Sequence, residues 1–591
     1  MRQLLVLTFI LWLVAGLGLS LLLHATSYNE LVAALAQPNY AAEYEGRLPV
    51  LTPARYEALQ LGLQLVAGVG AAGLLVLRLK RGVGRRARRR PQNKIGQSWQ
   101  ELATPQRVLV AGLGLAALGV RAWLLVQQPI TTDELTSFDY YVRLGGAVTA
   151  SNYSLPNNHI LYNLLVGSLP TGALPPDWQQ RLPAVLIGVM LLPISYLLLL
   201  RYLRFGAATL ALGLFTFTPM AAFYSIAGRG YGLQLAAVVA GFFATLALLA
   251  GGRRREPWVV FVVSGVVGLY AVPTHLYALV ALGLALLVGF GRQAGRQRQL
   301  NIGQLGLATF AIGTTTAVLY APVGAVLGWP ALLHNPYVQS LSWAAFGRGL
   351  YDPYLLGMAS QLWGQGRASL LGLAVLAGVG ALALSRWRGP ARHLGWLSYA
   401  LVFLPLLLLA AQRVYVPARA LLPSVLFSFV LLALLGQEML GPLAARLRAR
   451  WPRYWQAGTL GLLLVTISGY GIYRLSHEAV GMRAIATQHA HLRQQLGWLR
   501  AQGPARVWLD SLSRPYQGIY WYHLGVVQQV PMPLVVAKTL PTHATQAGAN
   551  EYAVFCRGRG TVPPPALAAQ APAYTDAYIY VWKLPALPPA P

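Results

Sequence analysis

Long apolar runs constrain this chain more than any other feature, because a helix that crosses a membrane needs about 20 mostly apolar residues. By this length rule the sequence contains about thirteen such runs. They lie near residues 4–23, 57–79, 107–127, 182–200, 207–225, 231–250, 258–274, 275–290, 303–322, 368–385, 395–411, 417–435 and 456–474. Charged residues make up 10% of the chain, against about 25% in soluble domains. The sequence therefore predicts an α-helical polytopic membrane protein.

The net charge of +30 is gathered in short basic clusters between the apolar runs. The clusters are KRGVGRRARRR at 80–90, RYLR at 201–204, RRR at 253–255, RQAGRQR at 292–298, RWRGPARH at 386–393 and RLRARWPR at 446–453. A cytoplasmic N-terminus places every one of these clusters on the cytoplasmic side, in agreement with the positive-inside rule. The distribution thus indicates membrane topology, and we expect no nucleic-acid partner. The first run is longer than the apolar core of a signal peptide, so we expect a retained helix rather than a cleaved signal.

This orientation requires an odd number of spans and places the loop at 128–181, the connection at 323–367 and the tail after residue 475 outside. The tail contains strand-like runs at 505–511, 550–558 and 577–584, which predict a small α/β domain. We expect a two-helix extension with a basic loop at 1–106, a transmembrane core at 107–475 and an extracytoplasmic domain at 476–591. The single cysteine, Cys556, excludes an internal disulfide and a cysteine-based metal cluster.

The outward loop begins with TTDELTSFDYY, which crowds three of the 16 acidic residues of the chain into seven positions. The spacing predicts a helix on which Asp139 forms a surface pair with Arg143, four residues later. Asp133 and Glu134 lack such a local partner, which makes them candidates for acid–base chemistry. The alternative is that Asp133 caps the helix or adds negative charge to its start.

A second polar segment, PNNHILYN at 156–163, follows in the same loop. Asn157 or Asn158 can cap a helix on which His159, Tyr162 and Asn163 share one face. Such a stripe suits a wall that faces a ligand. The alternative is that His159 is an interfacial residue held by hydrogen bonds.

Three further motifs stand at the predicted outer ends of spans: TPMAAFYSIAGRGYGLQL at 218–235, PTHLYAL at 273–279 and QRVYVPARALLP at 412–423. They place Arg229, His275, Arg413 and Arg419 at one level of the membrane. Arginines can extend to lipid headgroups, but a guanidinium also pairs bidentately with phosphate. A shared phosphorylated lipid ligand would account for cations that gather on the outer side.

In their order along the chain, the acidic pair, RLPAVLIGV at 181–189, TPMAAFYSIAGRGYGL, PTHLYAL and RVYVPAR resemble the GT-C superfamily of polytopic glycosyltransferases. The nearest group is family 39, with the protein O-mannosyltransferases and the lipid A aminoarabinose transferase. The resemblance covers about 107–475. It implies an enzyme of the bacterial inner membrane that uses a polyprenyl-phosphate-linked sugar as donor and acts on an extracytoplasmic acceptor.

The resemblance also assigns residues. The first-loop aspartate matches Asp133, with Glu134 completing the acidic pair. His159 carries over from a histidine-proline-proline stretch that here reads NNHILYN, and Arg229 and Tyr231 carry over from a motif whose acidic or amide partner is missing here. The expected donor-binding residues are His159, Tyr162, Asn163, Arg229, Tyr231, His275, Arg413 and Arg419.

The residues suit such a reaction on chemical grounds. Cations can neutralise the charge that develops on a departing phosphate, and one carboxylate can take the proton of the acceptor hydroxyl. Attack from the opposite face would invert the anomeric centre. No cofactor is required, and a divalent metal stays an open question. The alternatives are a transporter or flippase of a lipid-linked substrate, and a non-catalytic assembly protein that keeps the fold as a scaffold.

Overall fold

The computed structural model describes residues 1–36, 51–79, 94–170, 175–251, 255–333, 339–387, 389–510, 513, 517–537, 539–557 and 562–586. The basic cluster predicted at 80–90 lies outside these described residues, as do the first two arginines of the cluster at 253–255.

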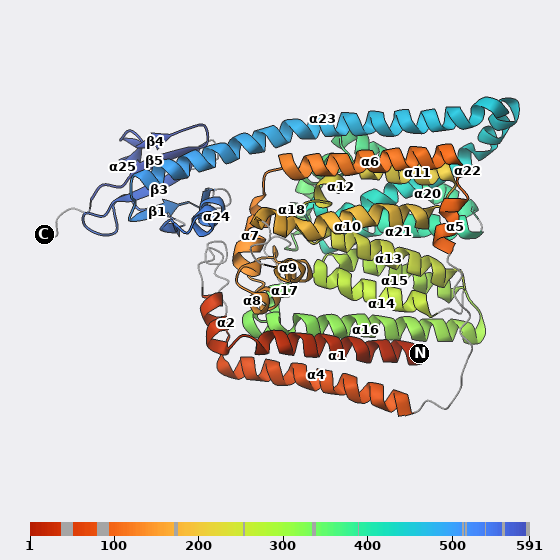
Figure 1. The fold of residues 1–591 in the computed structure, drawn as a ribbon, viewed down its shortest axis with the longest axis horizontal. Helices are drawn as coiled ribbons and strands as arrows, with labels where there is room; N and C mark the ends of the chain where they lie inside the picture. The colour runs from red at the N-terminus through yellow and green to blue at the C-terminus, as the bar shows by residue number, and fades with distance from the viewer. Residues whose placement is uncertain are drawn as a thin grey trace.

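Within the described residues, nine helices are long and apolar enough to cross a membrane. They are α1 (Arg2–His24), α4 (Pro53–Leu79), α6 (Thr104–Gln127), α10 (Pro176–Leu199), α13 (Tyr231–Leu249), α16 (Gly295–Leu327), α20 (Gly366–Arg386), α21 (Gly389–Gln412) and α22 (Leu422–Arg450). Three apolar helices are shorter: α11 (Phe205–Thr216), α14 (Glu256–Ala271) and α15 (His275–Gly291). Figure 1 shows that these helices form a bundle and that their axes are roughly aligned. The prediction of a polytopic helical membrane protein is therefore confirmed.

Prolines set two of the breaks between helices. The predicted run at 207–225 is interrupted, because α11 ends at Thr216 and a short helix, α12 (Pro219–Tyr224), begins at a proline. Proline lacks the N–H that a continuing helix needs and disfavours helical geometry in the residue before it. The predicted break near 274 is confirmed, since α14 ends at Ala271 and α15 begins at His275.

The last predicted span, 456–474, is the first part of a much longer helix, α23 (Pro452–Ala501). This helix is not among the nine described helices of spanning composition. It runs without interruption through residue 475, where we expected the transmembrane core to end, and continues to the C-terminal domain. One rigid element therefore connects the bundle to that domain.

The loop at 128–181 and the C-terminal domain lie at the same end of the bundle (Figure 1). The loop folds into α7 (Thr132–Ser137), the π-helix η1 (Phe138–Val142), α8 (Gly146–Ser151) and α9 (Ile160–Gly167). The connection from α22 to α23, which lies within the basic cluster at 446–453, is at the opposite end (Figure 1). The predicted topology requires the loop and the C-terminal domain to lie on the side of the membrane opposite the basic cluster at 446–453, and this arrangement agrees with it. Which end faces the cytoplasm stays a prediction.

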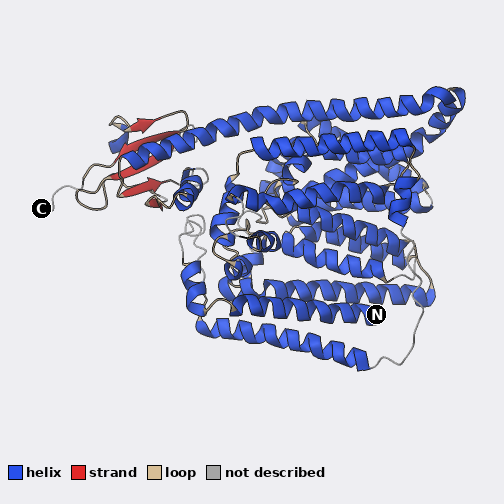
Figure 2. Ribbon diagram, viewed as in Figure 1, coloured by secondary structure: helices blue, strands red, loops and turns tan. Residues whose placement is uncertain are grey.

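The C-terminal domain contains a five-stranded sheet in the order β2-β1-β3-β5-β4 (Figure 2). Its elements are β1 (Arg506–Leu509), α24 (Ile519–Val527), β2 (Leu534–Val536), β3 (Glu551–Cys556), α25 (Pro565–Ala568), β4 (Tyr574–Thr575) and β5 (Ile579–Lys583). β1 runs parallel to β2 and β3, and β5 runs antiparallel to β3 and β4. The three predicted strands are β1, β3 and β5, so the α/β character is confirmed.

The two N-terminal helices pack closely and support the loop. A Cβ on Gly16 would lie 2.6 Å from the Leu63 carbonyl oxygen, so glycine allows the backbones of α1 and α4 to approach. Leu19 and Leu23 of α1 share a core with Ala147 of α8 and with α2 (Tyr28–Leu35). The remaining short helices are α5 (Lys94–Gln100), α17 (Pro330–Leu333), α18 (Trp343–Gly349), the π-helix η2 (Leu350–Leu355), α19 (Leu356–Leu362) and the 3-10 helix η3 (Ala418–Leu421).

Candidate functional site

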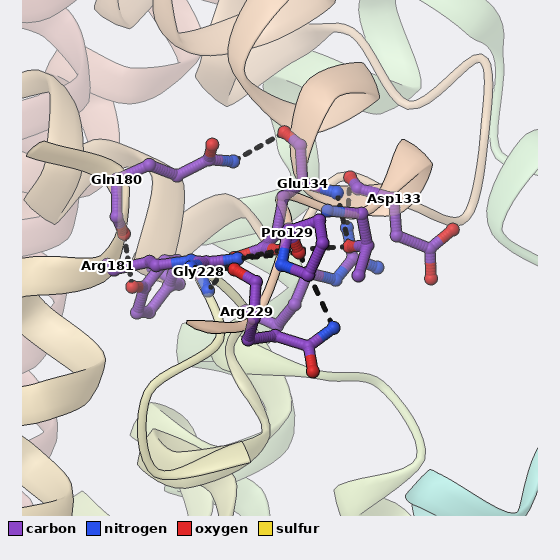
Figure 3. A network of polar contacts seen from close by, with 10 residues as sticks. Pro129, Asp133, Glu134, Gln180, Arg181, Gly228 and Arg229 are labelled. Atoms are coloured by element: carbon purple, nitrogen blue, oxygen red, sulfur yellow. Dashed lines mark hydrogen bonds and ion pairs between the residues drawn. The ribbon is translucent and has the colours of Figure 1, made fainter. Parts of the chain in front are cut away.

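Polar side chains from distant parts of the sequence meet at the loop end of the bundle (Figure 3). They come from α7, from the segment before α9, from the start of α10, and from the turn at 225–230 between α12 and α13. η3 adds a side chain from the late part of the chain. The predicted motifs of the first loop, of 218–235 and of 412–423 therefore converge.

Glu134 is fully buried and binds three of these parts together. Arg181 at the start of α10 donates Nε to Oε1 at 2.9 Å and Nη2 to Oε2 at 3.1 Å. The Gly228 N–H donates to Oε1 at 2.8 Å, and the N–H and hydroxyl of Thr131 each donate to Oε2 at 2.9 Å. Burial alone would raise the pKa of Glu134, but the charge of Arg181 and these hydrogen bonds outweigh it and lower the pKa. Both oxygens are thus occupied, which fits a structural carboxylate.

Among the described residues Glu134 thus has no local charge partner, as expected, but it has a distant one in Arg181. The capping alternative is corrected, because Thr131 caps α7: its hydroxyl accepts from the Glu134 N–H at 3.3 Å. Asp133 only contributes negative charge to the first turn.

Asp133 is the accessible carboxylate of the pair. Its side chain is 41% exposed, and Figure 3 shows it turned away from Glu134 and Arg181. Oδ2 lies 3.3 Å from Nη2 of Arg419. The Asp133 carbonyl accepts from Asn157 at 2.8 Å and from Arg229 at 3.0 Å, which fixes the backbone and leaves the carboxylate at the surface of the site.

Arg229 is a buried cation that cross-links the loop. Arg229 is only 3% exposed, so its guanidinium does not extend to lipid headgroups. Nη1 donates to the Asp133 carbonyl, to the Ser137 hydroxyl at 2.6 Å and to the Asn157 carbonyl at 3.1 Å. Within the described residues it forms no ion pair with a carboxylate, and Nε has no hydrogen-bond partner. Within the described residues its positive charge therefore meets the oxygen atoms of neutral groups and no carboxylate.

His159 lies against Arg229 and Tyr231. The Gly230 N–H donates to Nδ1 at 2.7 Å, so a neutral ring carries its proton on Nε2. Burial, and then the charges of Arg229 and Arg419, hold the pKa of His159 well below its usual value, which favours this neutral form. Nε2 lies 3.3 Å from Nη2 of Arg229. Arg229 can only donate, so two N–H groups face each other here and do not satisfy one another.

Tyr231 and Arg419 complete the group. The Arg419 Nε donates to the Tyr231 hydroxyl at 3.0 Å, and the ring of Tyr231 packs edge-on against His159 with centroids 4.8 Å apart. Arg419 also lines a cavity of about 410 Å³ formed by α12, η2, α19 and the segment at 415–419. Tyr224, Tyr354 and Gln361 line the same cavity, so Arg419, the partner of Asp133, borders a space with polar and apolar walls.

Other predicted residues lie elsewhere. Tyr162 is buried and its hydroxyl donates to the Gln180 carbonyl at 2.6 Å, while Asn163 donates to Asn158 at 2.8 Å. These two side chains face the protein interior. His275 is buried at the start of α15 and packs on Gly268. Arg413 stacks on Trp343, with its guanidinium carbon 5.4 Å from the ring centroid.

The predicted cap of the helix at 160 is also wrong. His159 occupies the position before α9, and no side chain caps it. Asn157 instead donates to Asp133, and Asn158 donates to the Thr149 carbonyl at 2.8 Å.

The predicted pair of Asp139 and Arg143 is wrong as well. Asp139 is buried, and its Oδ2 lies 3.0 Å from Nδ1 of His523 in α24 of the C-terminal domain. Arg143 donates to the Asp139 carbonyl at 3.3 Å and to the Tyr522 hydroxyl at 3.1 Å. The reason is that 138–142 form a π-helix, whose wider turn displaces the positions that an α-helix would align.

Sequence reasoning assigned no role to Arg181, Ser137 or His523. Arg181 carried one signal, since it is a cation at the head of an apolar run. For metals, no group of three or more His, Cys, Asp and Glu side chains in the described ranges is arranged to hold an ion.

Comparison with known proteins finds no matching family model and no matching curated protein. One of the solved structures that match is the arabinosyltransferase EmbB from Mycobacterium smegmatis, at 18% sequence identity and a TM-score of 0.39. The match covers 64% of this chain and 34% of the other, so this chain spans about a third of the length of that protein.

Proposed function

We propose that this chain is a membrane glycosyltransferase that moves a sugar from a polyprenyl-phosphate donor to an acceptor hydroxyl outside the cytoplasm. The observation that carries the proposal is the charge arrangement around Asp133. The accessible carboxylate of Asp133 pairs with Arg419, which lines a cavity. The Asp133 backbone is bonded to Arg229, which lies against neutral His159.

The cations suit a phosphate. Arg181 is neutralised by Glu134, and Arg419 is paired with Asp133, whereas Arg229 has no carboxylate partner in the described part of the chain. A buried positive charge without a partner favours binding of an anion. Within the described residues Nη1 of Arg419 makes no hydrogen bond, so this residue of the cavity wall retains a donor. A phosphate oxygen at this place would gain guanidinium contacts that strengthen as the leaving group acquires charge.

Asp133 is assigned the role of general base. It removes the proton of the acceptor hydroxyl while the hydroxyl oxygen attacks the anomeric carbon and the bond to the phosphate oxygen breaks. The departing phosphate needs no proton, so one carboxylate suffices, and attack opposite the leaving group inverts the anomeric centre. Glu134 acts indirectly, because its bonds to Arg181 and Gly228 position α7 and the turn that carries Arg229.

The test compares a strain that lacks the gene with strains that carry the wild-type chain, Asp133→Asn or Glu256→Gln. Glu256 is a carboxylate in the first turn of α14 and serves as the control. Mass spectrometry measures polyprenyl-linked sugars and envelope glycans, lipids and proteins. We expect the deletion and Asp133→Asn to accumulate one lipid-linked sugar and lose one glycosylated product, and Glu256→Gln to restore both. Unchanged sugar lipids and products in the deletion strain would contradict the proposal, and a lipid-linked sugar trapped on the cytoplasmic face would favour a flippase.

A further inference from the structure

A second cavity, apart from the site, lies between α6, α10 and α11. Its volume is about 740 Å³, and apolar side chains such as Leu113, Leu118 and Leu192 form most of its wall. Along α6 it extends from Val110 to Arg121, which at 1.5 Å per residue is about 17 Å. A groove of this length and composition, between helices that cross a membrane, suits a hydrocarbon chain.

Arg121 is the exception in this wall. It is 4% exposed and lies six residues before the end of α6 at Gln127, a depth of about 9 Å. Its Nη1 donates only to the Ala117 carbonyl of its own helix, at 3.0 Å, and its Nε has no partner in the described chain. No carboxylate of the described residues pairs with it. A charged side chain at membrane depth is costly unless a counter-charge meets it.

The groove is separate from the cavity beside Asp133. α12 lies between them, because Met220 and Tyr224 line the site cavity while Ala222 shares a core with Leu124 of α6. The donor phosphate proposed at Arg229 and Arg419 therefore does not neutralise Arg121.

We propose that this groove binds an anionic phospholipid of the surrounding bilayer, with its phosphate on Arg121 and an acyl chain along α6 toward Trp99. The guanidinium gains the bidentate partner that the protein does not supply, and the chain fills the space between α6 and α10. Because α6 leads directly into the segment that carries Asp133, the bound lipid also steadies the loop against the bundle.

Two variants remove the site in different ways. Arg121→Leu deletes the phosphate contact and keeps an apolar side chain. Gly114→Leu keeps the arginine and fills the groove, since Gly114 lines the cavity and a Cβ there meets no atom within 4 Å. Gly112→Leu is the matched control, because Gly112 lies on the same helix with equally open space but does not line the groove. Arg78→Leu, at an exposed arginine near the end of α4, controls for loss of charge.

The full chain is purified in mild detergent, and native mass spectrometry measures retained lipid. Thermal unfolding is then recorded with added phosphatidylglycerol micelles, inorganic phosphate or polyprenyl phosphate. We expect the wild type and both controls to retain a phospholipid and to be stabilised by phosphatidylglycerol, and both groove variants to lose the retained lipid and this shift.

The proposal would be overturned if Gly114→Leu, or a folded Arg121→Leu, retained as much phospholipid as the wild type. It is overturned equally if the retained mass is a polyprenyl phosphate, which would assign the groove to the donor, or if inorganic phosphate alone gives the whole shift. These measurements need no transfer activity, so they are independent of the proposed function.

Discussion

Glu134→Gln should destabilise the protein far more than Asp133→Asn, although both remove one negative charge from adjacent positions. Glu134 is fully buried and accepts five hydrogen bonds, two of them from Arg181. A glutamine keeps one acceptor oxygen but turns an amide N–H toward groups that also donate, and it leaves Arg181 without its counter-charge. Breaking a buried pair in this way costs about 3–5 kcal/mol. Asp133 has a 41% exposed side chain, so loss of its pair with Arg419 should cost at most about 1 kcal/mol.

The assay is thermal or chemical unfolding of the purified chain in one detergent, with folded yield from size-exclusion chromatography. The double variant Glu134→Gln, Arg181→Met removes both charges and should recover part of the loss, because replacing a whole buried pair costs less than removing one partner. If Glu134→Gln is as stable as Asp133→Asn, or if the double variant is no better than Glu134→Gln, then Glu134 does not hold these segments together.

Three further results are expected. Asp133→Asn should fold and bind donor but lose transfer by about a hundred- to ten-thousand-fold, whereas near-normal transfer would remove Asp133 as the base. Arg229→Lys should weaken donor binding, since it loses the guanidinium fork, and Arg229→Ala should weaken it more; equal donor affinity in all three proteins would leave Arg229 a purely structural cross-link. Burial lowers the pKa of His523, but the hydrogen bond to Asp139 and the negative charges of Asp139 and Asp177 together outweigh burial and raise it. This pair should therefore stabilise the docked C-terminal domain fully below about pH 6.5 and lose its effect as pH rises through the raised pKa. Proteolysis of the tail as a function of pH tests this, and the pH dependence should disappear in Asp139→Asn.

The sequence determined the elements that depend on local composition. The predicted apolar runs lie mostly in helices, and the breaks near 217 and 272 come just before Pro219 and Pro273. The three longer strands of the tail were also predictable, because they are short apolar runs separated by Pro, Gly and Ala. The shortest strands, β2 and β4, were not, since two or three residues carry no period.

The sequence also nominated much of the site, since Asp133, His159, Arg229, Tyr231 and Arg419 do come together. These residues were nominated because polar side chains stood at the predicted ends of spans. Packing of the bundle brings those ends to the same depth in the membrane. Whether these residues have the assigned roles stays a prediction.

Only the tertiary structure decided which charges are partnered. Glu134 and Asp133 are neighbours in the chain, yet Glu134 is buried against Arg181 and Asp133 is partly exposed beside Arg419. Asp139 finds its partner in a helix near the other end of the sequence, because a π-helix turns it away from Arg143. Local spacing predicts contacts within a helix, but burial and long-range pairing depend on where packing places each helix face. For that reason a carboxylate that supports the fold and one that is available for chemistry look alike until the chain is folded.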